Sequence, residues 1–278
     1  PVVTPFMSQT ALRLLTYNIQ VAIGSRRYRH YVSHGWRYVM PHGQSLHNLD
    51  RIAEVLAPFD IVGLQEADGG SFRTAFVDQA RYLAATAGFN ACQSMITRDF
   101  GRFAQHTNSL LSRLPVQAVH EHRLPGAMDG RGVLEVRFNL DARPLTVFVT
   151  HLALRQRTRI RQVAYLARLV NAVGPSIVMG DFNAKPRSKE LSLLCERAGL
   201  RVSTRPTHAT LPSWRPRVAV DHILATPEIV LEEYGPIPEL LSDHLPVQAL
   251  ARWKVPADAE APPQETEEPI PAASPESV

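Results

Sequence analysis

The sequence has few of the residues that build disulfide-stapled or zinc-clipped proteins. It contains 278 residues but only 2 cysteines, Cys92 and Cys195, which lie far apart in apolar surroundings. This excludes a disulfide framework and is typical of buried thiols in a reducing compartment, so we expect a cytoplasmic protein. Because CxxC and HExxH spacings are absent, a dedicated zinc site is not expected.

Long hydrophobic runs are also missing. No apolar run approaches the roughly 20 residues that span a bilayer, and residues 1–6 lack the basic region and apolar segment of a secretory signal. No repeat occurs at the period of a solenoid. We therefore expect a monomeric globular protein without a transmembrane segment, large enough to bury a substantial core.

Positive charge is absent from the C-terminal end. Residues 255–278 contain six acids, many prolines and no Lys or Arg, which predicts a disordered acidic tail after a single domain over about 8–254. Without these six acids the chain has 30 basic and 20 acidic residues, a net charge of about +10. This excess indicates an anionic partner such as a phosphate ester, a nucleic acid or an acidic membrane surface, although solubility alone would also account for it.

Hydrophobic periodicity predicts alternating strands and helices along the domain. Apolar runs predict strands at about 12–17, 61–64, 89–96, 107–112, 116–122, 132–140, 145–150, 176–180, 218–224, 229–233 and 245–253. Amphipathic patterns predict helices at about 45–57, 74–87, 156–173 and 188–198. In the second helix, Phe76 and Val77 are expected to face the core. This order is typical of an α/β protein with two sheets packed face to face and helices outside.

The stretch 176–183 combines a buried strand with a polar end. Three apolar residues lead to Gly180, and a carboxylate and a carboxamide follow at Asp181 and Asn183. Polar groups at the end of a buried strand are how an α/β sheet presents catalytic side chains to a crevice. The alternative is an Asx-turn, in which the two side chains only satisfy a sharp chain reversal.

Polar residues also follow other apolar runs. Such residues come at the ends of five runs, at Asn18, Glu66, His151, Asp181 with Asn183, and Asp221 with His222. A sixth group, Ser242 to His244, directly precedes the last strand. Polar groups gathered on one rim of a sheet stack make a site. We expect His222 to be a core histidine and His106 to be an ordinary polar one.

The segments TYNIQ, LQE, THL, GDFN, DHIL and SDHLP resemble, in order, the motifs of the endonuclease/exonuclease/phosphatase superfamily over about residues 12–252. That superfamily includes type I deoxyribonucleases, abasic-site endonucleases, inositol polyphosphate 5-phosphatases and neutral sphingomyelinases. The resemblance implies a DNase I-like, four-layered α/β sandwich and a divalent-metal phosphoesterase. The segment at Thr150 to Leu152 replaces a tyrosine-containing segment of the abasic endonucleases, which argues against that branch.

The resemblance implies a metal site made of oxygen ligands. Glu66 matches the main metal carboxylate, Asn18 lies beside it, and Asp243 completes the acidic set. The implied cofactor is Mg²⁺, with Mn²⁺ as the alternative. Mg²⁺ prefers oxygen ligands, keeps several waters and usually takes one or two protein carboxylates, a demand that Glu66 and Asp243 meet.

The resemblance also implies which groups act on the phosphate. Asp181 and Asn183 would position and deprotonate the attacking water or bind the phosphate. His244 would contact the scissile phosphate or act as acid and base, with Asp221 orienting its ring. His151 would donate a hydrogen bond to a phosphoryl oxygen.

Further residues are expected to contact the substrate. Asn108 matches a position that contacts phosphate in the phosphatase and sphingomyelinase-like branches. Two other segments interleave arginine with aromatic side chains, which suits phosphate-rich or base-stacking ligands. From these segments we predict substrate contacts by Arg26, Arg27, Arg29, Trp36, Trp214 and Arg215. The alternative is that the aromatic side chains only anchor exposed loops to the body.

Together these features predict a Mg²⁺-dependent phosphoesterase that hydrolyses a phosphodiester by in-line attack of an activated water. The substrate is expected to be a nucleic acid, a phospholipid or an inositol phosphate. The alternative from a different class is a non-catalytic module on the same fold that holds nucleic acid or anionic lipid on its basic rim.

Overall fold

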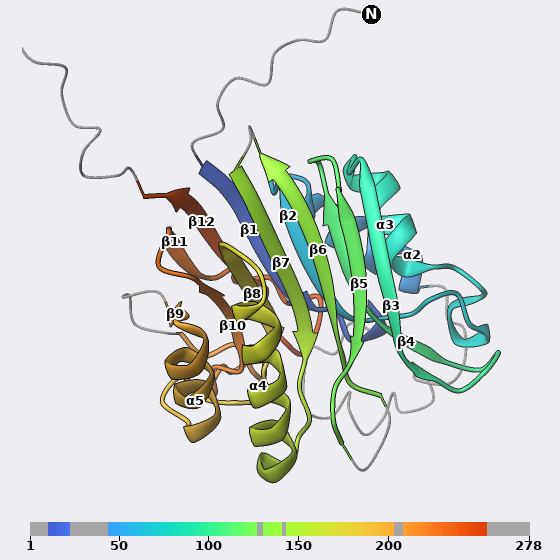
Figure 1. Cartoon of the computed structure of the whole chain (residues 1–278). Coiled ribbons are helices and arrows are strands. Elements are labelled where there is room, and N and C mark those ends of the chain that lie inside the picture. The colour runs from blue at the N-terminus through green and yellow to red at the C-terminus, as the bar shows by residue number, and fades with distance from the viewer. Residues whose placement is uncertain (1–10, 23–43, 127–129, 141–142, 203–207, 255–278) are drawn as a thin grey trace, which may run out of the picture.

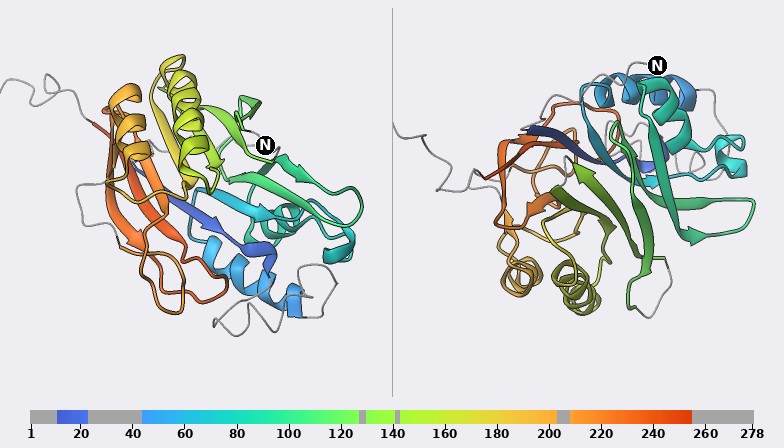
Figure 2. Two further views of the ribbon diagram at one scale, coloured as in Figure 1. Left: turned by 90° about the horizontal axis from the view of Figure 1, so that it is seen from below. Right: turned by 45° about the horizontal axis from the view of Figure 1, so that its top comes forward.

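Two six-stranded sheets pack face to face, with helices on their outer faces (Figure 1). The computed structural model describes residues 11–22, 44–126, 130–140, 143–202 and 208–254. The layers follow the order helix, sheet, sheet, helix, so the predicted four-layered α/β sandwich is confirmed (Figure 2). The predicted acidic tail lies outside the described residues.

The first sheet has the strand order β11-β12-β1-β2-β4-β3. Its strands are β1 (Ala11–Asn18), β2 (Ile61–Ala67), β3 (Ala91–Asp99), β4 (Gln105–Ser112), β11 (Ile229–Pro236) and β12 (Val247–Trp253). In the middle of the sheet, β1 pairs parallel with β2 and antiparallel with β12. Both faces of β1 are buried from Leu14 to Asn18, as expected for a strand covered by a helix layer and by a second sheet.

The second sheet has the strand order β5-β6-β7-β8-β10-β9. Its strands are β5 (Ala118–Arg123), β6 (Gly132–Leu140), β7 (Arg143–His151), β8 (Ser176–Asp181), β9 (Arg201–Val202) and β10 (Asp221–Ala225). Here β7 and β8 run parallel, while β10 runs antiparallel to β8. The inner faces of the two sheets share one apolar core that includes Leu14, Val149 and Met179.

Helices cover the outer faces, as the right panel of Figure 2 shows. The first sheet is covered by α2 (Gln44–Leu56) and α3 (Gln79–Ala87), and the second by α4 (Gln156–Asn171) and α5 (Lys189–Ala198). Two 3₁₀ turns, η1 (Gln20–Ala22) and η3 (Phe72–Thr74), follow β1 and β2. None of the helices in the described part of the chain is long and apolar enough to cross a membrane.

Strand direction brings the predicted polar residues to one end of the sandwich. The parallel pairs β1–β2 and β7–β8 end together, so Asn18, Glu66, His151 and Asp181 share that end. The antiparallel strand β10 begins there, with Asp221 directly opposite Asp181. The antiparallel strand β12 also begins there, because Val247 pairs with Thr16. The segment that precedes β12 therefore carries its polar residues to the same end.

One predicted helix is shorter than its apolar pattern indicates. The helix expected over 74–87 begins only at Gln79, and Phe76 is 64% exposed rather than buried. The Asp68 carboxylate accepts hydrogen bonds from the backbone N–H groups of Gly70 and Ser71, just before this segment, and from the Thr74 hydroxyl, and these local bonds compete with the helical ladder. Ala75 and Phe76 consequently adopt positive φ values of 52° and 63°.

Candidate active site

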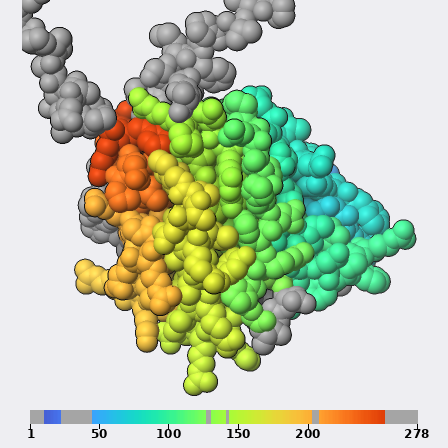
Figure 3. Space-filling view, viewed as in Figure 1, coloured from blue at the N-terminus to red at the C-terminus, as the bar shows by residue number. Residues whose placement is uncertain are grey.

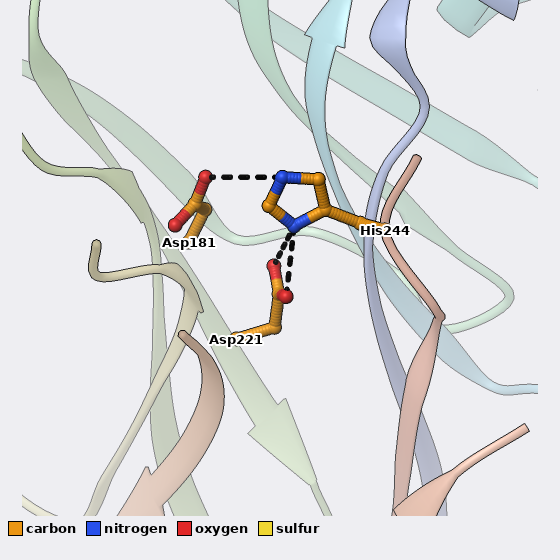
Figure 4. A group of neighbouring side chains, drawn as sticks. All are labelled: Asp181, Asp221 and His244. Atoms are coloured by element: carbon orange, nitrogen blue, oxygen red, sulfur yellow. Dashed lines mark hydrogen bonds and ion pairs between the residues drawn. The ribbon is translucent and has the colours of Figure 1, made fainter. Parts of the chain in front are cut away.

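The imidazole of His244 lies between two carboxylates at this end of the sandwich (Figure 4). Its Nδ1 is 3.1 and 2.9 Å from the two carboxylate oxygens of Asp221, and its Nε2 is 3.9 Å from Oδ2 of Asp181. Burial disfavours the charged imidazole, but Asp221 first, and then Asp181, raise the pKa of His244 well above its ordinary value. The two carboxylates therefore favour the protonated imidazole, and its Nε2 is on the side of Asp181.

Backbone geometry fixes the position of Asp181. The preceding Gly180 has φ of 146°, and a Cβ there would lie 1.9 Å from the Thr150 carbonyl oxygen. Only glycine allows β8 to approach β7 this closely. Asn183 has φ of 48°, and its backbone N–H donates to Oδ1 of Asp181 at 2.9 Å. The Asx-turn considered from the sequence is thus present, and it orients the Asp181 carboxylate.

The second oxygen of Asp181 has two partners. Asn18 Nδ2 and His151 Nε2 each lie 3.3 Å from its Oδ2. Burial raises the pKa of Asp181, and Asp221 raises it further, whereas His244 and the Asn183 N–H lower it. Burial also keeps the pKa of His151 well below its ordinary value. The neutral form of His151 is therefore favoured, and its Nε2 lies beside the Asp181 carboxylate.

Glu66 reaches the rim of the site through a β-bulge. The register between β2 and β4 shifts between Gln65 and Ala67, and Glu66 has φ of 57°. Bulges redirect a side chain at the end of a ladder. The Glu66 side chain is 28% exposed, and its Oε1 lies 3.9 Å from His151 Nδ1. Burial first, and Asp243 second, raise the pKa of Glu66, while the Asn18 amide is among the groups that lower it.

A serine ties the two remaining predicted metal ligands together. The Ser242 hydroxyl donates to the Asn18 carbonyl oxygen at 2.7 Å and lies 3.2 Å from Oδ1 of Asp243. The Gln20 backbone N–H donates to Oδ1 of Asn18 at 3.1 Å. Asn18 and Asp243 are both buried. The structure therefore brings Glu66, Asn18 and Asp243 to the same end of the sandwich, each with a side-chain oxygen.

A cavity of about 280 Å³ lies directly beside these groups. Arg98, Arg131 and Arg155 line it, and Glu66 is the only acid among its described lining residues. Within the described ranges, none of the three guanidinium groups lies within 4.0 Å of a carboxylate oxygen. Burial lowers the pKa of Arg131, and Glu66 and Asp181 raise it. A cavity with three arginines and one lining acid has an excess of positive charge, which suits an anionic ligand.

Most residues that line this cavity were not predicted as site residues, among them Arg98, Arg155, Arg131 and His106. Arg131 comes from a short segment between two glycines, where no apolar run marks a strand end. His106 was expected to be an ordinary histidine, but it lines the cavity, and its Nε2 lies 3.4 Å from Arg73 Nη1. Burial and then Arg73 lower the pKa of His106 to about 4.

A larger cavity, of about 550 Å³, lies away from this site. Its walls come from β1, from α2 and from the β11–β12 hairpin, and they include Arg13, Glu54 and Glu239. None of the residues predicted for catalysis or metal binding lines it. The smaller cavity is therefore the one associated with the predicted chemistry.

The residues predicted to contact the substrate differ in burial, and some lie outside the described residues. Asn108 is buried, and its Nδ2 donates to the Gly132 carbonyl at 2.9 Å, while its Oδ1 has no partner among the described residues. Trp214 is half-buried and Arg215 is exposed. The adjacent Ser213 N–H donates to the Asp243 carbonyl at 2.6 Å, which attaches this segment to the loop that carries His244. The other four predicted contacts, Arg26, Arg27, Arg29 and Trp36, lie outside the described residues.

His222 is a core histidine, as expected from the sequence. Its Nε2 lies 2.8 Å from the Ala184 carbonyl oxygen, and its side chain is fully buried. The Phe182 ring contacts it at a centroid distance of 5.6 Å. It therefore supports the strand end that carries Asp181 without facing the cavity.

Fold and site together define a DNase I-like sandwich with its polar groups at one end of both sheets. The family model of the endonuclease/exonuclease/phosphatase family matches residues 15–244, and the chain belongs to this family. An uncharacterised relative, YbhP of Escherichia coli K12, is 35% identical over 131 residues, which cover 42% of this chain and 50% of YbhP. The match thus spans half the length of that relative.

Solved structures of low sequence identity share the fold. An endonuclease/exonuclease/phosphatase protein from Beutenbergia cavernae superposes with a TM-score of 0.70 at 20% identity, covering 88% of this chain and 72% of the other. A mannosyl-6-phosphatase from Bacteroides thetaiotaomicron superposes with a TM-score of 0.66 at 14% identity, covering 87% and 100% of the two chains.

Proposed function

We propose that this protein is a Mg²⁺-dependent phosphoesterase that hydrolyses a phosphodiester by in-line attack of an activated water. The observation that carries the proposal is the buried Asp221–His244–Asp181 arrangement beside Glu66 and a cavity lined by three arginines. Members of this family are generally phosphoric ester hydrolases, and family membership supports the same reaction class.

Glu66, Asn18 and Asp243 would hold the metal ion. Their side-chain oxygens are the donors that Mg²⁺ or Mn²⁺ prefers. When bound, the ion would neutralise charge on the phosphate. Asp181, Asp221 and His244 also bring ligand atoms within 4.8 Å of one another, a spacing that could hold a metal. We favour the Glu66 set, because Nδ1 of His244 is already paired with both oxygens of Asp221.

Asp181 would act as the general base and His244 as the general acid or hydrogen-bond donor. Asp181, whose pKa is raised, is placed to accept a proton from the attacking water, and Asn183 holds its carboxylate in position. His244, kept charged by Asp221, would donate a hydrogen bond from Nε2 to the phosphate or a proton to the leaving oxygen. His151, whose Nε2 lies near Asp181, would donate a hydrogen bond to a phosphoryl oxygen.

The arginine-lined cavity would receive the rest of an anionic substrate. Asn108, Trp214 and Arg215 remain proposed contacts, together with the predicted contacts in segment 24–43. The substrate is a nucleic acid, a phospholipid or an inositol phosphate. We also propose that the enzyme is a monomer and acts in the cytoplasm, and the two free cysteines support the cytoplasmic location.

The experiment is a turnover assay of the purified full chain against DNA, RNA, phospholipids and inositol phosphates. Each substrate is tested with Mg²⁺, with Mn²⁺ and with EDTA. We expect hydrolysis that EDTA abolishes, and no hydrolysis by Asp181→Asn or His244→Gln at unchanged melting temperature. Binding of the same ligands without turnover would instead support the non-catalytic module.

A further inference from the structure

Four phenylalanine side chains are exposed on two neighbouring loops. Phe72 and Phe76 lie between β2 and α3, and Phe100 and Phe103 lie in the turn between β3 and β4; we name them the phenylalanine cluster. Their exposed fractions are 40%, 64%, 51% and 70%, respectively. In the space-filling view the chain near residue 100, in green at the right-hand edge, projects from the body (Figure 3). Contiguous exposed apolar surface of this kind marks an interaction site in soluble proteins.

The two loops are bonded to each other. The Phe72 N–H donates to the Arg102 carbonyl at 2.7 Å, and the Arg73 N–H donates to the Phe103 carbonyl at 3.4 Å. The rings of Phe72 and Phe76 are in edge contact, with centroids 6.4 Å apart. Beneath them, Asp68 is fully buried and pairs with the Arg73 guanidinium at 2.5 Å. The two loops are therefore held in fixed positions by these interactions, and the four phenylalanines are not isolated exposed residues.

The cluster continues into the mouth of the arginine-lined cavity. Arg98 lines the cavity, and its guanidinium carbon lies 4.9 Å from the centroid of the Phe100 ring. Leu154, two residues before the start of α4, also lines the cavity and is 74% exposed. Exposed apolar side chains from two separate segments thus lie at or next to the cavity, together with its arginines.

A partner must match both the apolar flanks and the cationic mouth. A bilayer containing anionic lipids offers an apolar interior beneath negatively charged head groups, and aromatic and arginine side chains are favoured at that boundary. Single-stranded nucleic acid is the other candidate, because it stacks on aromatic rings. However, Leu154 is aliphatic, and one face of the Phe100 ring is already covered by Arg98. These observations favour the bilayer.

We propose that the phenylalanine cluster and Leu154 dock this protein on an anionic lipid bilayer, with the cavity mouth facing the membrane. The inference rests on the proposed phosphoesterase function and narrows its substrate to a phospholipid head group. Arg98, Arg131 and Arg155 would receive the negatively charged head group, while the flanking apolar side chains enter the edge of the acyl region.

The test is co-sedimentation of the full chain with vesicles in EDTA, so that binding is measured without turnover. Vesicles of phosphatidylcholine alone are compared with vesicles containing phosphatidylglycerol. We expect binding to the anionic vesicles and a loss of about tenfold or more in the Phe100→Ser/Phe103→Ser variant, because the two apolar rings no longer enter the membrane. The melting temperature of the variant is also measured, so that a loss of vesicle binding can be told apart from unfolding.

A matched control is available on other surfaces of the molecule. Val230 and Leu240 are 38% and 41% exposed and lie outside the cluster, so Val230→Ser/Leu240→Ser should bind vesicles like the parent chain. Absence of vesicle binding, or equal losses in both double variants, would overturn the docking surface. Cluster-dependent binding of fluorescent single-stranded DNA without vesicle binding would also overturn it. Hydrolysis of soluble bis(4-nitrophenyl) phosphate with Mg²⁺ tests the proposed function separately, because it needs no membrane.

Discussion

Nδ1 of His244 is bonded to both carboxylate oxygens of Asp221, at 3.1 and 2.9 Å, and the pair is buried. Asp221 is fixed in turn by the Thr210 hydroxyl, which donates to its Oδ2 at 2.5 Å. An imidazole held in this way has one orientation and leaves only Nε2 for the substrate. The proposed chemistry depends on this relationship.

The first prediction concerns this pair. Asp221→Asn keeps the shape of the side chain but removes the charge that keeps His244 protonated, so we expect kcat to fall about 10²–10⁴-fold with little change in KM. Steady-state kinetics on bis(4-nitrophenyl) phosphate measures both constants. An unchanged kcat would show that Asp221 has only a structural role.

The second prediction concerns the close approach of β7 and β8. Gly180→Ala should destabilise the fold by about 3 kcal/mol or more, because the new Cβ would overlap the Thr150 carbonyl oxygen. Gly174→Ala is the matched control, since no atom lies within 4 Å of its added Cβ. Urea unfolding of both variants gives the comparison, and equal stabilities would refute the geometry described for Gly180.

The third prediction is a dependence of stability on pH. His106 has a folded-state pKa of about 4 against an ordinary value of 6.5, so the unfolded chain takes up a proton first as the pH falls. The stability present above pH 6.5 is therefore lost progressively between pH 6.5 and about 4, by on the order of 1–3 kcal/mol. His106→Gln should lose less stability over this range in urea unfolding. An equal loss of stability in the parent chain and in the His106→Gln variant would exclude His106 as the cause.

The fourth prediction concerns the charge of the cavity. Arg131→Ala and Arg155→Ala should each raise KM for an anionic substrate by about 3–30-fold, and the difference should shrink at high salt because the attraction is screened. Arg161→Ala is the control, because Arg161 is exposed on the same helix as the cavity wall but does not line the cavity. KM values measured at low and high ionic strength test whether the arginines attract the substrate through their charge. A similar rise in the Arg161 variant would indicate a general effect of net charge.

Much of the fold could be predicted because apolar runs and turn residues are local features. The strand that ends at Gly180 and Asp181 is visible in the sequence, since three apolar residues precede the glycine. The gathering of Asn18, His151 and Asp181 followed from strand direction, which the order of the motifs implied. The alternation of strands with amphipathic helices gave the layered architecture.

Other parts of the site depend on contacts that local sequence does not encode. Arg131 enters the cavity from a short segment without periodicity, and Glu66 reaches the rim only because a bulge forms between β2 and β4. The apolar pattern placed Phe76 in a helix, but the buried Asp68 holds this segment in another conformation. In each case a long-range or side-chain-to-backbone interaction overrides the local preference.

The most direct test of the account is hydrolysis of a phosphodiester by the purified chain and by His244→Gln, each with Mg²⁺ and with EDTA. We predict that only the parent chain with Mg²⁺ releases product, and that both proteins share one melting temperature. Product release that is equal in the two proteins, or that persists in EDTA, would contradict the proposed site.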